Sequence, residues 1–93
     1  MASFTVRVEL HDATWIDYDE LHKAMNLKAF SRTIVGSDGI RYKLPDAEYY
    51  TTANMTKTQV LERARQAANT TGKSYGVFVT ESSGCTWIGL EQV

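Results

Sequence analysis

The stretch FSRTIVGSDGIRYKLP, residues 30–45, decides the fold class. Two runs that suit β-strands, 30–36 and 40–44, flank Ser37-Asp38-Gly39, and Gly39 can supply the positive φ that a tight hairpin turn needs. Pro45 has no backbone N–H for a ladder, so it should break the second strand before the chain continues extended over residues 47–54. These features predict a β-hairpin in the middle of the chain.

A strand and a helix are predicted before the hairpin. Residues 3–11, SFTVRVELH, alternate between apolar and polar side chains, which is typical of a strand with one buried face. Thr14 and Asp17 form a capping-box pattern that opens a helix, which should end within residues 26–29. The helical spacing turns three side chains inward (Tyr18, Leu21, Met25) and three outward (His22, Lys23, Asn26).

A second helix and strand are predicted after the hairpin. Thr56 and Gln59 form another capping box, and Gly72 is a natural helix stop. The helix carries an apolar stripe of Val60, Leu61, Ala64, Ala67 and Ala68 that suits close packing on a sheet. Residues 75–81 read as a strand, and CTWIGLEQ, residues 85–92, could add another. The order βαββαβ predicts a single α+β domain over residues 1–93, ferredoxin-like, with an antiparallel sheet and both helices on one face.

Composition narrows the class of protein. The 93 residues are 43% hydrophobic and 23% charged, which is ordinary for one globular domain. Ten basic and eleven acidic residues give a net charge of −1, so any contact with nucleic acid must come from a local basic patch. Cys85 is the single cysteine, which excludes an internal disulfide and fits a reducing compartment. No apolar run is long enough to cross a membrane, so we expect a cytoplasmic protein.

The candidate catalytic groups cluster where the first strand ends. His11 and Asp12 close that strand, while His22 belongs to the helix beyond, and the two histidines lack the spacing of a zinc site. Asp12, with Asp17 and Asp19 nearby in sequence, could hold Mg²⁺. Alternatively, Asp12 makes the turn and the other two carboxylates complement the helix dipole. Histidine suits proton transfer near neutral pH because its pKa lies in that range.

Basic and aromatic side chains gather around the hairpin. Arg32, Arg41 and Lys43 are interleaved with Tyr42, and Tyr49 and Tyr50 follow closely. Such a patch can bind RNA by charge and by stacking on bases. Charges on a solvated strand pair also protect a sheet edge from aggregation, and this alternative stays open.

Several segments together resemble a known family. They are a helix ending in AM…F, then SRTIVGSDGI, a spacer with Leu44, EYYTTANMT, and a helix starting TQVLERAR, and the resemblance covers roughly residues 4–80. The pattern is similar to the GhoS-like antitoxin endoribonucleases and to small prophage-type relatives. The resemblance implies a ferredoxin-like fold related to CRISPR-associated nucleases and cleavage of a toxin's messenger RNA. The C-terminal CTWIGLEQV has no clear counterpart in the family.

The resemblance also implies site residues. Asp12 matches the place of a metal-binding aspartate in the CRISPR-associated relatives, and a basic residue on the first helix would fall near His22 and Lys23. From the resemblance together with the residue pattern, we expect catalytic roles for His11, Asp12 and His22, and no cofactor, with Mg²⁺ at Asp12 as the open alternative. We expect RNA contacts from Arg7, Lys23, Arg32, Arg41, Tyr42 and Lys43. The expected partner is the messenger RNA of a small membrane toxin, and the chain could act as a homodimer.

A second hypothesis comes from a different class of function. A near-neutral prophage-type protein could act without catalysis by docking to a host protein, for example as an inhibitor of a defence system. Trp15, Trp87, Tyr49 and Tyr50 would then be exposed anchors, because aromatic residues dominate interface hot spots.

Overall fold

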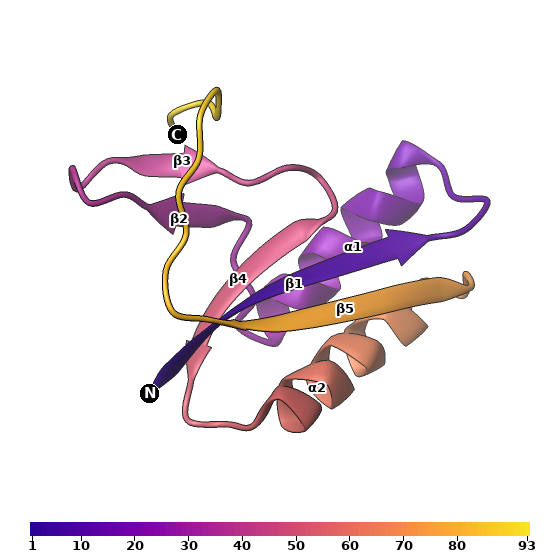
Figure 1. The fold of residues 1–93 in the computed structure, drawn as a ribbon. Helices are drawn as coiled ribbons and strands as arrows, with labels where there is room; N and C mark the ends of the chain where they lie inside the picture. The colour runs from indigo at the N-terminus through magenta and orange to yellow at the C-terminus, as the bar shows by residue number, and fades with distance from the viewer.

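The computed structural model describes residues 1–93 and has an α+β ferredoxin-like fold, as predicted. Three antiparallel strands form the main sheet in the order β4-β1-β5, and both helices pack on the same face of it (Figure 1). The elements in chain order are β1 (Ala2–Leu10), α1 (Trp15–Leu27), β2 (Thr33–Val35), β3 (Arg41–Lys43), β4 (Glu48–Ala53), α2 (Lys57–Asn69) and β5 (Tyr75–Ser82).

The core lies between the central strand and the two helices. Alternate residues of β1 are buried, as the sequence pattern predicted, and Val6 lies opposite Tyr49 of β4 and Val79 of β5. Residues directly opposite each other in an antiparallel pair share a face, so Tyr49 points into the core. The twelve buried side chains of the core are Phe4, Val6, Val8, Leu10, Leu21, Met25, Phe30, Tyr49, Val60, Ala64, Ala67 and Ala68.

Both predicted helix starts are confirmed. The backbone N–H of Thr14 donates to the Asp17 carboxylate at 2.9 Å, which fixes the start of α1. Thr56 and Gln59 satisfy each other's backbone N–H groups at the start of α2, at 3.2 and 2.9 Å. Each box satisfies N–H groups that the first turn of a helix leaves without intrahelical partners.

The central hairpin forms, but it does not extend the main sheet. Its predicted strands, 30–36 and 40–44, shorten to β2 and β3, which pair only with each other. One β-bridge between Ser31 and Tyr50, with two backbone hydrogen bonds of 2.8 Å, connects the start of the hairpin to the edge of β4. Pro45 then separates β3 from β4, so the hairpin stands beside the sheet (Figure 1).

The C-terminal segment lies against the hairpin. Residues 85–92 do not form the further strand that the sequence suggested, and only Gln92 makes a β-bridge, with Tyr42. The N–H of Lys43 donates to the carbonyl of Glu91 at 2.8 Å, and the N–H of Val93 donates to the carbonyl of Arg41 at 3.0 Å. Figure 1 shows this segment, in yellow, running from the end of β5 across β2 and β3.

Candidate functional site

The helical position of His22 predicted that its side chain faces solvent, and this was wrong. The side chain lies half-buried against the sheet. Its Nδ1 shares a hydrogen bond of 2.5 Å with the hydroxyl of Tyr49, whose side chain is completely buried. The register of β4 causes this, because pairing with Val6 turns the Tyr49 ring toward α1. The sheet therefore supplies a polar partner that the periodicity of the helix alone could not reveal.

A cleft opens beside this histidine, and we call it the His22 cleft. It measures about 360 Å³ and is lined by Trp15, Tyr18, Asp19, His22, Asp46 and Ala47. Trp15, at the start of α1, is 78% exposed. The cleft thus places an imidazole among two aromatic rings and two carboxylates at the surface.

An ion pair lies between the His22 cleft and a second cavity. One guanidinium nitrogen of Arg32 lies 2.9 Å from the carboxylate of Asp46, a residue that lines both spaces. The second cavity measures about 490 Å³, and Arg32 and Lys43 supply its cations. The ammonium group of Lys43 lies 3.8 Å from the Glu91 carboxylate. Two of the predicted RNA-binding residues thus line a cavity that shares Asp46 with the His22 cleft.

The charge state of His22 follows from its surroundings. Burial lowers the pKa of His22, and the positive charge of Arg32 lowers it further, while Asp46 and Asp19 act in the opposite direction. The imidazole is consequently neutral at pH 7, the form that can accept a proton. Burial raises the pKa of Tyr49, so the phenol keeps its proton at neutral pH.

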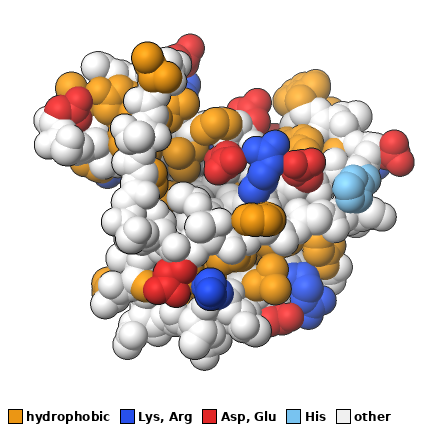
Figure 2. All heavy atoms as spheres, viewed as in Figure 1, with side chains coloured by type: hydrophobic (Ala, Val, Ile, Leu, Met, Phe, Trp, Pro, Cys, Tyr) orange, Lys and Arg blue, Asp and Glu red, His pale blue; other side chains and the backbone are white.

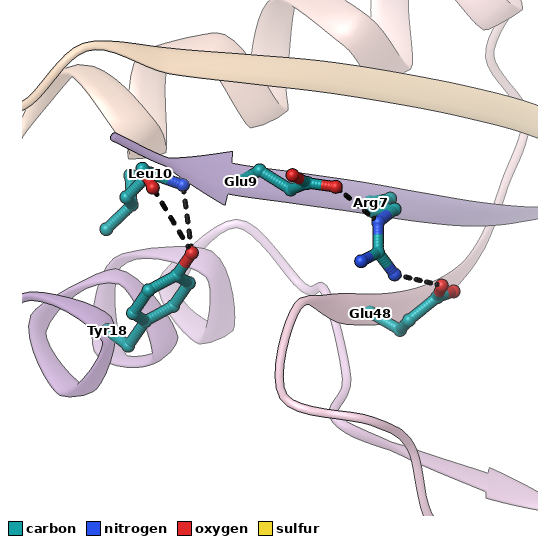
Figure 3. A network of polar contacts seen from close by, with 5 residues as sticks. All are labelled: Arg7, Glu9, Leu10, Tyr18 and Glu48. Carbon is teal, nitrogen blue, oxygen red and sulfur yellow. Dashed lines mark hydrogen bonds and ion pairs between the residues drawn. The ribbon is translucent and has the colours of Figure 1, made fainter. Parts of the chain in front are cut away.

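Tyr18 attaches the cleft to the end of β1 (Figure 3). Its hydroxyl accepts the Leu10 N–H at 3.0 Å and donates to the Leu10 carbonyl at 3.5 Å. The Tyr18 ring centroid lies 6.4 Å from that of His22. These contacts fix the wall of the cleft relative to the sheet.

His11 and Asp12 do not line the His22 cleft. Both are exposed, and the N–H of His11 donates to the Ser74 carbonyl at 2.9 Å, which joins the turn to the residue before β5. Asp12 has a φ of 51°, so it makes the turn, a conformation that aspartate tolerates better than most residues. No group of three or more His, Cys, Asp or Glu side chains that could hold a metal ion occurs in the structure, at Asp12 or elsewhere.

The other predicted RNA contacts are dispersed and locally paired. Arg7 lies on the open face of the sheet between Glu9 and Glu48, at 2.8 and 3.0 Å (Figure 3). Lys23 lies 3.4 Å from Asp19 on the exposed side of α1, and Arg41 donates to the Thr33 hydroxyl at 2.8 Å. Figure 2 shows acidic and basic side chains interspersed, with no broad basic area on the face in view.

The tyrosines near the hairpin have different environments. The sequence placed Tyr49 among the exposed aromatic residues, and this was wrong, because its side chain belongs to the core. Tyr42 is half-buried, donates to the Asp38 carboxylate at 2.9 Å and packs edge-to-face on Trp87. Sequence reasoning missed Asp46 as a site residue and missed the contact between Tyr49 and His22. The only available signal was the position of the EYY and LPD runs beside the hairpin.

Comparison with known proteins adds no functional information. Neither the scan against protein-family models nor the search of curated proteins gives a match to this chain. Neither α1 nor α2 combines the length and apolarity that crossing a membrane requires.

Proposed function

We propose that this chain is a GhoS-like antitoxin, an endoribonuclease that cleaves a toxin messenger RNA at the His22 cleft. The observation that carries the proposal is a half-buried imidazole in a surface cleft whose lining residue Asp46 is ion-paired with the Arg32 cation. RNA cleavage needs a proton acceptor for a ribose 2′-hydroxyl and positive charge for the phosphate. His22 supplies the first and Arg32 the second.

The reaction requires two proton transfers and one exchange of phosphorus–oxygen bonds. The tautomer of His22 that carries its proton on Nδ1 donates to the Tyr49 oxygen, and in this tautomer Nε2 has a free lone pair that accepts the proton of the 2′-hydroxyl. The 2′-oxygen attacks the adjacent phosphorus as the bond to the 5′-oxygen breaks. The leaving 5′-oxygen takes a proton from water, and the products are a 2′,3′-cyclic phosphate and a 5′-hydroxyl.

The carboxylates paired with Arg32 and Lys43 are compatible with a phosphate ligand because they are largely exposed. The side chain of Asp46 is 91% exposed and that of Glu91 is 80% exposed. Exposed ion pairs contribute only about 0–1 kcal/mol, so a phosphate can displace either carboxylate at small cost. Arg32 and Lys43, both lining the second cavity, would then hold consecutive phosphates.

The test is cleavage of single-stranded RNA by the purified protein, with and without EDTA. We expect His22→Gln to lower the rate by about 10²–10⁴, the usual contribution of a general base. His11→Gln is the matched control, because His11 lies outside the cleft, and it should retain the activity. Asp46→Asn should tighten RNA binding by removing the carboxylate that competes for Arg32. Absence of cleavage by the wild-type protein, or equal cleavage by His22→Gln, would refute the proposal.

The exposed apolar side chains favour a second candidate function, docking to a host protein without catalysis. Trp15 is 78% exposed, Phe78 69%, Leu27 86% and Ile88 97%. Trp15 and Phe78 are the strongest anchors of this set because aromatic residues dominate interface hot spots. Capture of one partner by the wild-type protein, lost in Trp15→Ala, together with no salt-dependent RNA affinity, would favour this function over the first.

A further inference from the structure

A separate cavity lies between the hairpin, the C-terminal segment and the open face of the sheet. It measures about 460 Å³, and we call it the hairpin–tail cavity. Ser3 and Tyr50 form its floor on the sheet, Tyr42 and Gly36 line it from the hairpin, and Trp87 lines it from the C-terminal segment. None of the residues described above as catalytic belongs to it.

Three aromatic rings border this cavity. The centroids of Tyr42 and Trp87 are 5.5 Å apart in an edge-to-face arrangement, and Tyr50 is half-buried on the floor. Gly36 makes room for the indole, because a Cβ there would lie only 3.3 Å from a ring carbon of Trp87. Aromatic rings that are partly exposed in a cavity are surfaces on which a planar ligand can stack.

The polar lining of the hairpin–tail cavity contains a carboxylate, Asp38, and no basic side chain. The carboxylate of Asp38 accepts hydrogen bonds from the Ile40 N–H and the Tyr42 hydroxyl, each at 2.9 Å. The backbone hydrogen bond from Ile40 holds the pKa of Asp38 below its usual range, so the group is a fixed anionic acceptor. No lysine or arginine lines the cavity. An anionic acceptor without a nearby cation disfavours a phosphate and favours a neutral ligand that carries N–H donors.

We propose that the hairpin–tail cavity binds an unpaired purine base of the RNA, stacked on Trp87 and Tyr50, with its exocyclic amino group donating to Asp38. This inference rests on the proposed function and adds a specificity site to it. The carboxylate favours bases with an exocyclic amino group, which adenine, guanine and cytosine have, over uracil, which flanks its single N–H with two carbonyl oxygens. The larger ring system of a purine stacks more strongly on the aromatic side chains than cytosine does, so a purine is the preferred occupant. Free carboxylate lone pairs remain for such a contact, because each oxygen can accept two hydrogen bonds.

The hairpin connects this base site to the phosphate site. Successive residues of a strand point to opposite faces, so Tyr42 lines the hairpin–tail cavity while Lys43 lines the second cavity beside Asp46. One short hairpin therefore presents a stacking surface on one face and cations on the other. That combination is typical of single-stranded RNA recognition, in which bases and phosphates contact different groups.

The experiment uses Trp87 as its reporter. The Trp15→Phe variant leaves Trp87 as the only tryptophan, and its fluorescence is followed while adenosine, guanosine, uridine or 9-ribosylpurine is added. The 9-ribosylpurine has the purine ring but no amino group. We expect saturable quenching by adenosine and guanosine, and about tenfold weaker binding of 9-ribosylpurine and uridine, the usual effect of losing one hydrogen bond to a charged group.

Two further variants keep the inference falsifiable. Asp38→Asn retains an oxygen for the Ile40 N–H, so the turn should form, but adenosine should lose its advantage over 9-ribosylpurine. Alkylation of Cys85, which lines the cavity and is the only thiol, should slow when adenosine is present. No saturable quenching, or equal affinity for all four nucleosides, would overturn the inference. If RNA cleavage that depends on His22 persists in that case, the proposed function stands, whereas purine binding without cleavage would leave the base site standing alone.

Discussion

Replacing Tyr49 with phenylalanine removes a single oxygen atom, and the structure gives the expected cost. The ring is completely buried, so phenylalanine fills the same space and the apolar contribution to the core is retained. What is lost is the hydrogen bond to Nδ1 of His22, which is left without a partner in a half-buried position. A hydrogen bond of this kind contributes about 1 kcal/mol, and for a domain of about 100 residues that lowers Tm by about 4–8 °C.

Thermal unfolding followed by circular dichroism measures this effect, and the neighbouring tyrosine provides the control. Tyr50 lies on the opposite face of β4, and its hydroxyl makes no hydrogen bond within the protein. Tyr50→Phe should therefore change the free energy of unfolding by no more than about 0.5 kcal/mol, as surface substitutions usually do. If Tyr49→Phe and Tyr50→Phe have equal effects, the His22–Tyr49 contact does not stabilise the fold.

The same variant separates the structural role of Tyr49 from its role in catalysis. In the proposed reaction Tyr49 positions the imidazole and does not exchange a proton, so its loss should cost less activity than the loss of His22. A free-energy difference of about 1 kcal/mol corresponds to roughly a fivefold change in rate. A drop in cleavage by Tyr49→Phe as large as that by His22→Gln would refute positioning as its role.

Three further predictions concern stability. The pKa of His22 is lower in the folded protein than in the unfolded chain, so the unfolded chain binds more protons on acidification. The free energy of unfolding should therefore fall between about pH 7 and pH 5, and it should fall more steeply in the wild type than in His22→Gln. The His11→Gln variant is the control. Leu21→Ala should lower the free energy of unfolding, measured by urea denaturation, by about 2–5 kcal/mol, because the Leu21 side chain is completely buried. Thr56→Ala removes the N-terminal cap of α2 and should lower the free energy of unfolding by about 0.5–2 kcal/mol. Thr58 is exposed in the first turn and caps nothing, so Thr58→Ala should lower it less in the same assay.

Features set by local chemistry were predictable from the sequence. The alternation over residues 3–11 gave the buried face of β1, because strand periodicity does not depend on distant contacts. The capping boxes at Thr14 and Thr56 gave both helix starts for the same reason. The ferredoxin-like fold class was predictable as well, but the predicted order βαββαβ has two strands between the helices, whereas the structure has three, β2, β3 and β4.

Features set by register between distant segments were not predictable. Tyr49 and Tyr50 are identical neighbours, and only the pairing of Tyr49 with Val6 and of Tyr50 with Thr5 decides which ring enters the core. His22 turned inward because Tyr49 offers it a buried hydroxyl from another element. The hairpin was expected within the main sheet, but one bridge at Ser31 is the only place where its pairing reaches β4.

The predicted RNA-binding cations differ in how many carboxylates each one contacts. Arg7 contacts two carboxylates at once, Glu9 and Glu48, and an RNA phosphate would have to displace both. Arg32 and Lys43 each face a single carboxylate that is at least 80% exposed. A phosphate can therefore displace the carboxylate partner of Arg32 or Lys43 more easily than the two partners of Arg7. Because every such contact replaces an existing ion pair, RNA affinity should be modest, which suits an enzyme that must release its products better than it suits a stoichiometric binder.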